Sequence, residues 1–442
     1  MEGSEKNVTI IGLGRSGLSA ARYLAARGWR IAVTDSRRDP PGKSSLAGFA
    51  PQARATYGRL DSALLEQATL VIVSPGVALD EPIFDTAKAR GLEIIGDIEL
   101  FARAVTAPVI AITGTNGKST VTTLVGQMAV RAGLRVAIGG NLGTPALDLL
   151  DDQVKDLFVL ELSSFQLDST QSLRLLAGTV LNVSSDHMDR YSDLSAYAAS
   201  KLRIYKHCEI AVVNLDDPCV MIPVGQQFLS FSLHSNRGAN FFLGNWEGKA
   251  WLMQGVEPLL PVSSLRISGL HNIANSLAAL ALATAAGIPR TAILAELREF
   301  KGLDHRCQWV ADIGGVRYIN DSKGTNVGAT LAAVSGLAGT LVLIAGGDGK
   351  GQDFSPLVPA LSMRTRLAIL IGRDAKSLAT SFGDSCPVKL CDTLEEAVDA
   401  AATVAEPGDT VLLSPACASQ DMFCDYVHRG EVFVAAVGRL LS

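Results

Sequence analysis

The sequence has little concentrated positive charge, few aromatic residues and no hydrophobic run long enough to cross a bilayer. Its 442 residues include 39 Lys and Arg scattered among 44 Asp and Glu, for a formal net charge of −5. A nucleic-acid surface needs clustered cations, so this partner is excluded, although a small anionic ligand is not. The most apolar helical run, residues 276–288, is too short for a membrane span, which takes about 20 residues. We therefore expect a buried core helix there and no membrane insertion.

The signals of secretion are also lacking. Residues 1–7 are polar and mixed in charge, without the basic start and cleavable apolar stretch of a signal peptide. The seven cysteines are scattered and form no CxxC pair, which favours reduced thiols over a disulfide framework or a zinc site. No short repeat, heptad run or low-complexity tract occurs. These absences predict a cytoplasmic globular protein.

Short apolar runs alternate with helical patterns along the whole chain, as in parallel sheets covered by helices. The length calls for several domains, and three α/β domains in series are the simplest arrangement: residues 1–96, 97–301 and 302–442. We expect Rossmann-like first and third domains, and a central parallel sheet of the P-loop ATPase type with β-rich decoration at residues 225–267. The expected strands are 8–11, 31–33, 70–73, 93–95, 109–112, 157–160, 179–183, 210–214, 241–243, 250–252, 316–319, 341–345, 367–371 and 410–413.

A glycine-rich turn separates the expected strand at 109–112 from an expected helix at 119–132. It reads Thr113-Gly114-Thr115-Asn116-Gly117-Lys118-Ser119-Thr120. Backbone N–H groups and a helix N-terminus converge at such a turn, which suits a polyphosphate. Lys118 would reach the β- and γ-phosphates of ATP, and the hydroxyl of Ser119 or Thr120 would bind Mg²⁺. The general phosphate loop would require glycine at Ile112, so the match is incomplete and a simple tight turn is the alternative.

A second glycine-rich turn, near the N-terminus, fits the dinucleotide fingerprint. Gly12-Leu13-Gly14-Arg15-Ser16-Gly17 follows the strand at 8–11, and Asp35 stands about 20 residues further on. Taken alone, this pattern predicts NAD and a nicotinamide-dependent oxidoreductase. A lone G-x-G-x-x-G is weak evidence, however, because the same chain carries an ATP-type loop.

Several long motifs follow one another over essentially the whole chain. Besides the loop at 113–120 they are ELSSFQL at 161–167, NVSSDHMDR at 182–190, KLRIY at 201–205, GLHNIAN at 269–275, HR at 305–306 and NDSK at 320–323. Together they resemble the Mur ligase family, the ATP-dependent enzymes that build the peptide of bacterial cell-wall precursors and share this loop with folylpolyglutamate synthetases. The resemblance implies that ATP phosphorylates a carboxylate and that an amine then attacks the acyl phosphate, with catalysis by positioning and charge neutralisation.

The resemblance implies four catalytic residues, Lys118, Glu161, His187 and Lys201. Glu161 would hold Mg²⁺ opposite Ser119, and His187 would be a second metal contact. Lys201 would carry a carbamate that helps to bind a second Mg²⁺. Without the resemblance, Glu161 would indicate a plain strand-end carboxylate, His187 a core histidine and Lys201 a surface lysine.

The ATP site is expected at the seam of the second and third domains, so that domain closure completes it. Amides that open a helix have the donors and acceptors to recognise adenine. The implied ATP contacts are Gly114, Thr115, Asn116, Gly117, Lys118, Ser119, Thr120, Asn272, Asn275, Arg306, Asp321 and Lys323. For the implied ATP contacts outside the loop at 113–120, the alternative role is in salt bridges on helix surfaces.

In this family the first-domain turn holds the uridine diphosphate of a sugar substrate. The contacts implied are Arg15, Ser16, Asp35, Ser36, Arg37, Ser74, Asn141 and His187. The segments 96–101, 346–354 and 413–419 imply UDP-N-acetylmuramoyl-L-alanine and D-glutamate as substrates, and the DNPR tetrapeptide of diaminopimelate-adding members is absent. D-Glutamate would contact Thr325, Lys350, Ser419 and Tyr426. A monomer is expected. The alternative functions are a folylpolyglutamate synthetase and a non-catalytic nucleotide-binding scaffold.

Three details depart from the family pattern. Tyr426 stands where Phe is usual, Gly324 replaces a common Ala, and Cys307-Gln308 replace a frequent Phe-Glu. None of them removes a charge that the chemistry needs. They bear on the shape of the amino-acid pocket.

Overall fold

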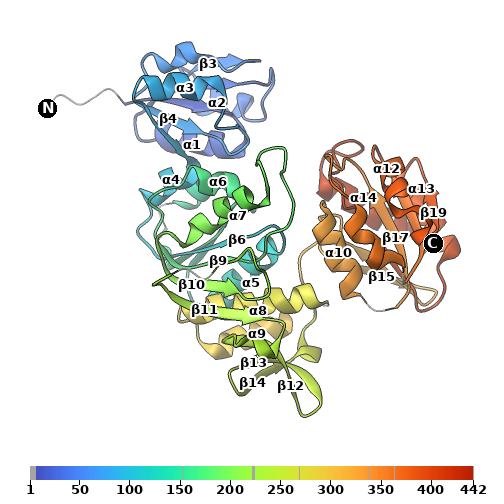
Figure 1. Cartoon of the computed structure of the whole chain (residues 1–442). Helices are drawn as coiled ribbons and strands as arrows, with labels where there is room; N and C mark the ends of the chain where they lie inside the picture. The colour runs from blue at the N-terminus through green and yellow to red at the C-terminus, as the bar shows by residue number, and fades with distance from the viewer. Residues whose placement is uncertain are drawn as a thin grey trace.

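The computed structural model contains three β-sheets in series, each packed against helices (Figure 1). The structure describes residues 6–151, 153–221, 224–267, 269–337, 339–362 and 364–441. Met1 to Glu5, which form most of the polar start discussed above, lie outside these described residues. The predicted α/β class with three units in series is confirmed, whereas the bounds at residues 96 and 301 stay predictions.

The N-terminal sheet is parallel, with the strand order β3-β2-β1-β4-β5. Its elements are β1 (Asn7–Ile11), α1 (Arg15–Ala25), β2 (Arg30–Asp35), α2 (Lys43–Phe49), β3 (Arg54–Tyr57), β4 (Leu70–Val73), α3 (Pro82–Ala89) and β5 (Glu93–Gly96). The central strands β1 and β4 are almost fully buried, as expected for apolar runs covered on both faces. Their carboxyl ends meet at one edge, where the turn at 12–17 begins.

The central sheet has the order β14-β13-β12-β11-β10-β9-β6-β8-β7. Its strands are β6 (Val109–Thr113), β7 (Val136–Gly140), β8 (Leu157–Glu161), β9 (Leu175–Val180), β10 (Cys208–Asn214), β11 (Gln227–Ser232), β12 (Phe241–Trp246), β13 (Lys249–Gln254) and β14 (Glu257–Pro261). Its helices are α5 (Lys118–Arg131), α6 (Ser164–Asp168), α7 (Leu194–Leu202), α8 (Leu270–Ala285) and α9 (Arg290–Glu299). Strands β12 to β14 pair antiparallel and form the predicted β-rich decoration.

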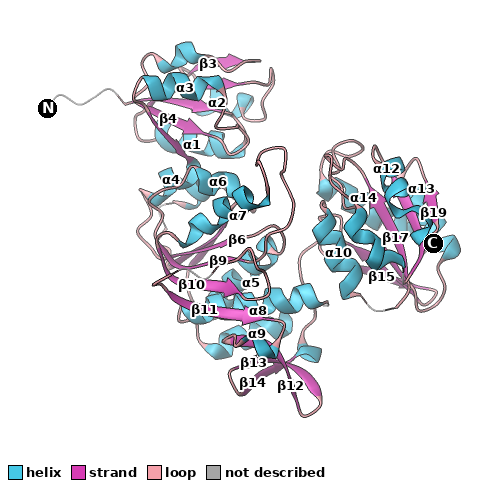
Figure 2. Cartoon of the chain, in the orientation of Figure 1, coloured by secondary structure: helices cyan, strands magenta, loops and turns pink. Residues whose placement is uncertain are grey.

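The C-terminal sheet has the order β15-β16-β20-β17-β18-β19, with β15 antiparallel to β16. Its strands are β15 (Gln308–Ile313), β16 (Val316–Asn320), β17 (Leu341–Gly346), β18 (Thr365–Ile371), β19 (Val388–Leu390) and β20 (Thr410–Leu413). Its helices are α10 (Val327–Gly336), α11 (Val358–Ser362), α12 (Ala375–Phe382), α13 (Leu394–Val404) and α14 (Tyr426–Arg439). Helices lie on both sides of these strands (Figure 2), which fits the predicted Rossmann-like arrangement.

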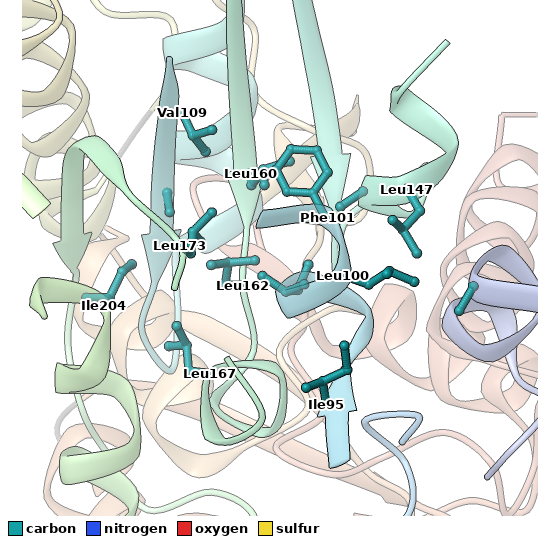
Figure 3. Packing of buried hydrophobic residues seen from close by; sticks show 14 of the residues in the cluster. Ile95, Leu100, Phe101, Val109, Leu147, Leu160, Leu162, Leu167, Leu173 and Ile204 are labelled. Carbon is teal, nitrogen blue, oxygen red and sulfur yellow. The ribbon is translucent and has the colours of Figure 1, made fainter. Parts of the chain in front are cut away.

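The helix α4 (Asp97–Ala102) joins the first sheet to the second. Its side chains Ile98, Leu100 and Phe101 are buried in an apolar cluster that runs from the N-terminal sheet into the central one (Figure 3). Phe101 packs edge-on against Phe158 of β8, with ring centroids 5.4 Å apart. The joint is therefore a packed interface.

Two expectations about single elements have clear outcomes. The helix α8 is buried almost all round, so the core helix predicted from residues 276–288 is confirmed. The strand expected at 179–183 is wrong in its bounds, because β9 begins at Leu175. Gly178 breaks the apolar pattern but not the pairing, since it pairs with both Ala211 and Ala111.

Among the helices of the described residues, none has the length and apolar character of a membrane span.

Candidate active site

The glycine-rich turn at 113–120 lies between β6 and α5, and Asn182 fixes its shape. The Asn116 N–H donates to Asn182 Oδ1 at 2.9 Å, and Asn182 Nδ2 donates to the Asn116 carbonyl at 3.1 Å. Gly117 has a φ of 83°, and a Cβ there would lie 2.3 Å from Asn275 Oδ1, so glycine is required on both counts. The turn thus presents the N-terminus of α5 to an anion.

A cavity of ≈ 420 Å³ lies where the three units meet. Its lining includes the four predicted catalytic residues, Lys118, Glu161, His187 and Lys201. The N-terminal unit contributes Pro75 and Gly76, and the C-terminal unit contributes Arg306, Lys323, Thr325 and Lys350. Residues far apart in the sequence therefore share one space.

Five cationic side chains line this cavity: Lys118, Lys201, Arg306, Lys323 and Lys350. Lys201 is only 1% exposed, and its Nζ donates to the Gly114 carbonyl at 2.9 Å. Lys118 Nζ donates to the Gly114 and Thr115 carbonyls at 2.9 and 2.7 Å. Burial lowers the pKa of Lys118 below its ordinary value. Burial also lowers the pKa of Lys201, to well below its ordinary value, and the nearby charge of Lys118 lowers it further. Burial, with Arg306 and Lys118, lowers the pKa of Lys323 to about 8. Such a cluster is built to receive an anion.

Glu161 ends β8 beside the loop hydroxyl. Ser119 Oγ donates to Glu161 Oε2 at 2.5 Å, and Asn141 Nδ2 donates to Glu161 Oε1 at 2.6 Å. Arg306 Nη2 reaches Ser119 Oγ at 2.6 Å. A paired carboxylate and hydroxyl suit Mg²⁺, which takes oxygen ligands. Within the described part of the chain, no group of three or more His, Cys, Asp or Glu residues could hold a metal.

His187 has a φ of 59°, in the left-handed region that is strained for such a residue. Its ring packs edge-on against Phe165 with centroids 5.0 Å apart, and its Nε2 lies 3.8 Å from Asp186 Oδ2. Burial lowers the pKa of His187. A neutral imidazole is the form that binds a metal.

A second cavity, of ≈ 330 Å³, adjoins the first at the seam of the central and C-terminal units. Asn272 and Asn275 line it from α8, and Asp321 lines it from the loop after β16. Ser414 Oγ donates to Asp321 Oδ2 at 2.7 Å, and the Cys307 N–H donates to Oδ1 at 3.1 Å. Burial nevertheless raises the pKa of Asp321 to about 6. Three of the predicted ATP contacts, Asn272, Asn275 and Asp321, thus line one cavity.

A third cavity, of ≈ 500 Å³, lies at the carboxyl ends of β1, β2 and β4. It is lined by the predicted sugar-nucleotide contacts Arg15, Ser16, Asp35, Ser36, Arg37, Ser74 and Asn141. The eighth predicted contact, His187, lines instead the ≈ 420 Å³ cavity where the three units meet, which is called the reaction cavity below. At Gly17 a Cβ would lie 2.0 Å from the Gly12 carbonyl oxygen, so the turn needs glycine there.

The carboxylate of Asp35 is already engaged. Arg37 forms an ion pair with it at 2.7 Å, and the Leu13 N–H donates to Oδ2 at 2.7 Å. Burial alone would raise the pKa of Asp35, but the hydrogen bonds from Arg37 and Leu13 outweigh it and lower the pKa. Asp35 therefore holds the turn, which weakens the case for the ribose contact that the dinucleotide fingerprint assigns to it.

Comparison with known proteins agrees with this geometry. Family models match in chain order: "Mur ligase MurD-like, N-terminal domain" over residues 6–96, "Mur ligase middle domain" over 112–283 and "Mur ligase, glutamate ligase domain" over 305–417. A UDP-N-acetylmuramoylalanine–D-glutamate ligase of Nitrosococcus oceani is 51% identical over 98% of this chain and 96% of its own. The enzyme of that name from Pseudomonas savastanoi is 52% identical over 98% of both chains. The chain belongs to the Mur ligase family.

Solved structures share the fold of this Mur ligase. A pseudomurein peptide ligase type C from Methanothermus fervidus has a TM-score of 0.62 at 19% identity, covering 98% of this chain and 100% of its own. A UDP-N-acetylmuramate–alanine ligase from Thermotoga maritima has a TM-score of 0.62 at 18% identity, covering 98% and 99%. Both likenesses extend over all three units.

The four residues predicted to bind D-glutamate do not all line the same cavity in this Mur ligase. Thr325 and Lys350 line the reaction cavity, whereas Ser419 and Tyr426 are not among its lining residues. Ser419 is buried, and the Tyr426 ring lies 4.0 Å from Lys323 Nζ. Tyr426 thus contacts a lining residue of the cavity without lining it.

Sequence reasoning missed several lining residues. Phe165, Asp186 and Tyr197 line the reaction cavity, and Gln166 lines the third cavity. Phe165, Gln166 and Asp186 fall inside the quoted motifs, so their positions were available. Gln352, a further lining residue, falls inside the quoted segment 346–354, whereas the lining residue Asn326 carries no local signal. Asn326 Nδ2 reaches Asn116 Oδ1 at 3.3 Å across the seam, a contact that only the fold creates.

Proposed function

We propose that this Mur ligase joins D-glutamate to UDP-N-acetylmuramoyl-L-alanine and converts ATP to ADP and phosphate. The observation that carries the proposal is the convergence of Lys118, Lys201, Lys323 and Arg306 beside the loop at 113–120, in a cavity shared by all three units. That arrangement supports phosphoryl transfer, which depends on positioning and charge neutralisation. The name shared by relatives 51–52% identical over 98% of the chain supports the choice of substrates.

The proposed mechanism has two steps. The alanine carboxylate attacks the γ-phosphorus of ATP, the bond from that phosphorus to the bridging oxygen breaks, and ADP leaves. Lys118, Lys323 and Arg306 neutralise the charge of the transferring group. The amine of D-glutamate then attacks the acyl phosphate carbon, loses a proton and displaces phosphate. Thr325 and Lys350 orient the glutamate carboxylates by hydrogen bonding.

Magnesium fits this site, and we propose two ions. Glu161, Ser119, His187 and a carbamate on Lys201 would hold them. The metal would supply charge neutralisation between the phosphates. Carbamate formation needs a neutral amine, and burial lowers the pKa of Lys201 well below its ordinary value.

The substrates also suggest the setting. ATP and nucleotide-linked sugars are cytoplasmic pools, so we place the reaction in the cytoplasm. The three cavities are built from one chain, so we propose that a monomer suffices for the reaction.

A phosphate-release assay across amino acids tests this function. Release is expected only when UDP-N-acetylmuramoyl-L-alanine and D-glutamate are both present with Mg²⁺ and ATP. L-Glutamate, D-alanine and diaminopimelate are the control amino acids, and none of them should support release in place of D-glutamate. Release with L-glutamate and a folate instead would contradict the proposal and indicate folylpolyglutamate synthesis.

A further inference from the structure

Asp97 is a buried carboxylate at the joint between the N-terminal and central sheets. It opens α4 and is 2% exposed. Gln166 Nε2 donates to its Oδ2 at 3.1 Å. Its other oxygen, Oδ1, is buried without a hydrogen-bond partner among the described residues. Asp97 forms no ion pair in the described chain, and a buried carboxylate without a cation destabilises a fold unless other groups compensate.

The groups around Asp97 come from both sides of the joint. Burial raises the pKa of Asp97, whereas Gln166, the Ser16 side chain and the first N–H groups of α4 lower it. Ser16 belongs to the first turn of α1 in the N-terminal unit, and Gln166 belongs to α6 of the central unit. Asp97 therefore lies between the two units.

Both neighbours of Asp97 line the ≈ 500 Å³ cavity, and Asp97 lies behind them. The Gln166 amide is fixed at its other end as well, because Oε1 accepts the Ser163 N–H at 3.1 Å in a capping box. Ser163 in turn lines the reaction cavity. One side chain thus connects the walls of two cavities.

We propose that Asp97 is a positioning residue for the sugar-nucleotide substrate. It holds the Gln166 side chain in place at the joint, so that the ≈ 500 Å³ cavity keeps the shape that binds the uridine diphosphate group. This inference rests on the proposed function for the identity of the substrate. Asp97 acts through its neighbours and does not itself line the cavity.

Glu99 provides a matched control on the same helix. It is 1% exposed, and its Oε2 accepts the N–H groups of Gln171 and Ser172 at 2.7 and 2.8 Å. Neither of these residues lines the ≈ 500 Å³ cavity. Glu99→Gln should therefore lower the melting temperature without changing the KM for the sugar nucleotide.

A charge-swap experiment tests the proposal in the full chain. Gln166→Glu sets two carboxylates against each other and should raise the KM for UDP-N-acetylmuramoyl-L-alanine about tenfold or more, with the KM for ATP within about threefold. Asp97→Asn alone should raise that KM about three- to tenfold. The two changes together exchange donor and acceptor and keep the capping box, so the KM should return to within about threefold of wild type.

Calorimetric binding of UDP-N-acetylmuramoyl-L-alanine to the same variants, with their melting temperatures, completes the test. If Asp97→Asn lowers the melting temperature but leaves KM and Kd unchanged, Asp97 serves only the N-terminus of α4 and the proposal is overturned. Failure of the double variant to recover overturns it too. A wild-type chain that binds the substrate without turnover contradicts the proposed function, and the Kd series then decides the role of Asp97. If Gln166→Glu does not fold, recovery of folding and Kd in the double variant supports the pairing.

Discussion

Lys323 lies among cations in a site that excludes much of the solvent, and this position has a measurable consequence. Its pKa falls from the ordinary 10.5 to about 8, first through burial and then through Arg306 and Lys118. Between these pH values the unfolded chain binds more protons than the folded chain, so the Lys323 contribution to the free energy of unfolding rises with pH. Below about pH 8 the buried charge is present and destabilises the substrate-free enzyme.

The variant Lys323→Met should therefore melt at a higher temperature than wild type at pH 7, because it buries no charge. The difference between the two proteins should shrink as the pH is raised from 8 toward 10, because wild-type Lys323 loses its proton. Thermal unfolding without nucleotide, at several pH values, measures this. A difference that stays constant across this range would show that Lys323 is not the titrating group.

Lys118 is the residue on which phosphoryl transfer depends most directly in this account. Lys118→Ala should lower kcat by at least about 100-fold, as is typical when a preorganised charge at the transition state is removed. Lys249→Ala, which changes an exposed lysine of β13, is the matched control and should leave kcat unchanged. Turnover of Lys118→Ala within about threefold of wild type would refute the role given to Lys118.

At the scale of elements, sequence patterns located the strand–turn–helix units that carry the chemistry. The strands β1 and β6 and the helix α5 lie within a few residues of their predicted positions, because an apolar run followed by a glycine-rich turn is a strong local signal. Where the sequence signal is weaker, strands were missed or misplaced. The strands β3, β7, β15 and β19 were not anticipated, and the start of β9 was misplaced by the interruption at Gly178.

The β1 turn gives the prediction at this scale. In Gly17→Ala the new Cβ would lie 2.0 Å from the Gly12 carbonyl oxygen, so the turn and the start of α1 must shift. We expect a lower melting temperature and at least about tenfold weaker binding of UDP, measured by calorimetry. Gly48→Ala on α2 is the control, since nothing lies within 4 Å of a Cβ there. Tight NADH binding by the wild-type chain, without UDP binding, would instead revive the dinucleotide interpretation of this turn.

At the scale of the whole molecule, the sequence predicted which residues line the cavities better than how those residues contact one another. Local motifs identified Lys118, Glu161, His187 and Lys201, but no pattern states that Arg306 reaches Ser119 at 2.6 Å. Contacts such as that between Asn326 and Asn116 depend on how the central and C-terminal units pack together. Side chains that meet only through docking leave no periodic trace in the sequence. This is also why Asp97, between two units, was not recognised from its motif.

The central claim is that a carboxylate is activated as an acyl phosphate, and oxygen transfer tests it most directly. UDP-N-acetylmuramoyl-L-alanine labelled with heavy oxygen in its alanine carboxylate is incubated with the wild-type chain, Mg²⁺, ATP and D-glutamate, and the released phosphate is analysed by mass spectrometry. Attack of the carboxylate on the γ-phosphorus leaves one carboxylate oxygen in the phosphate, so the account predicts one heavy oxygen in each phosphate formed. Unlabelled phosphate accompanying ligated product would contradict it.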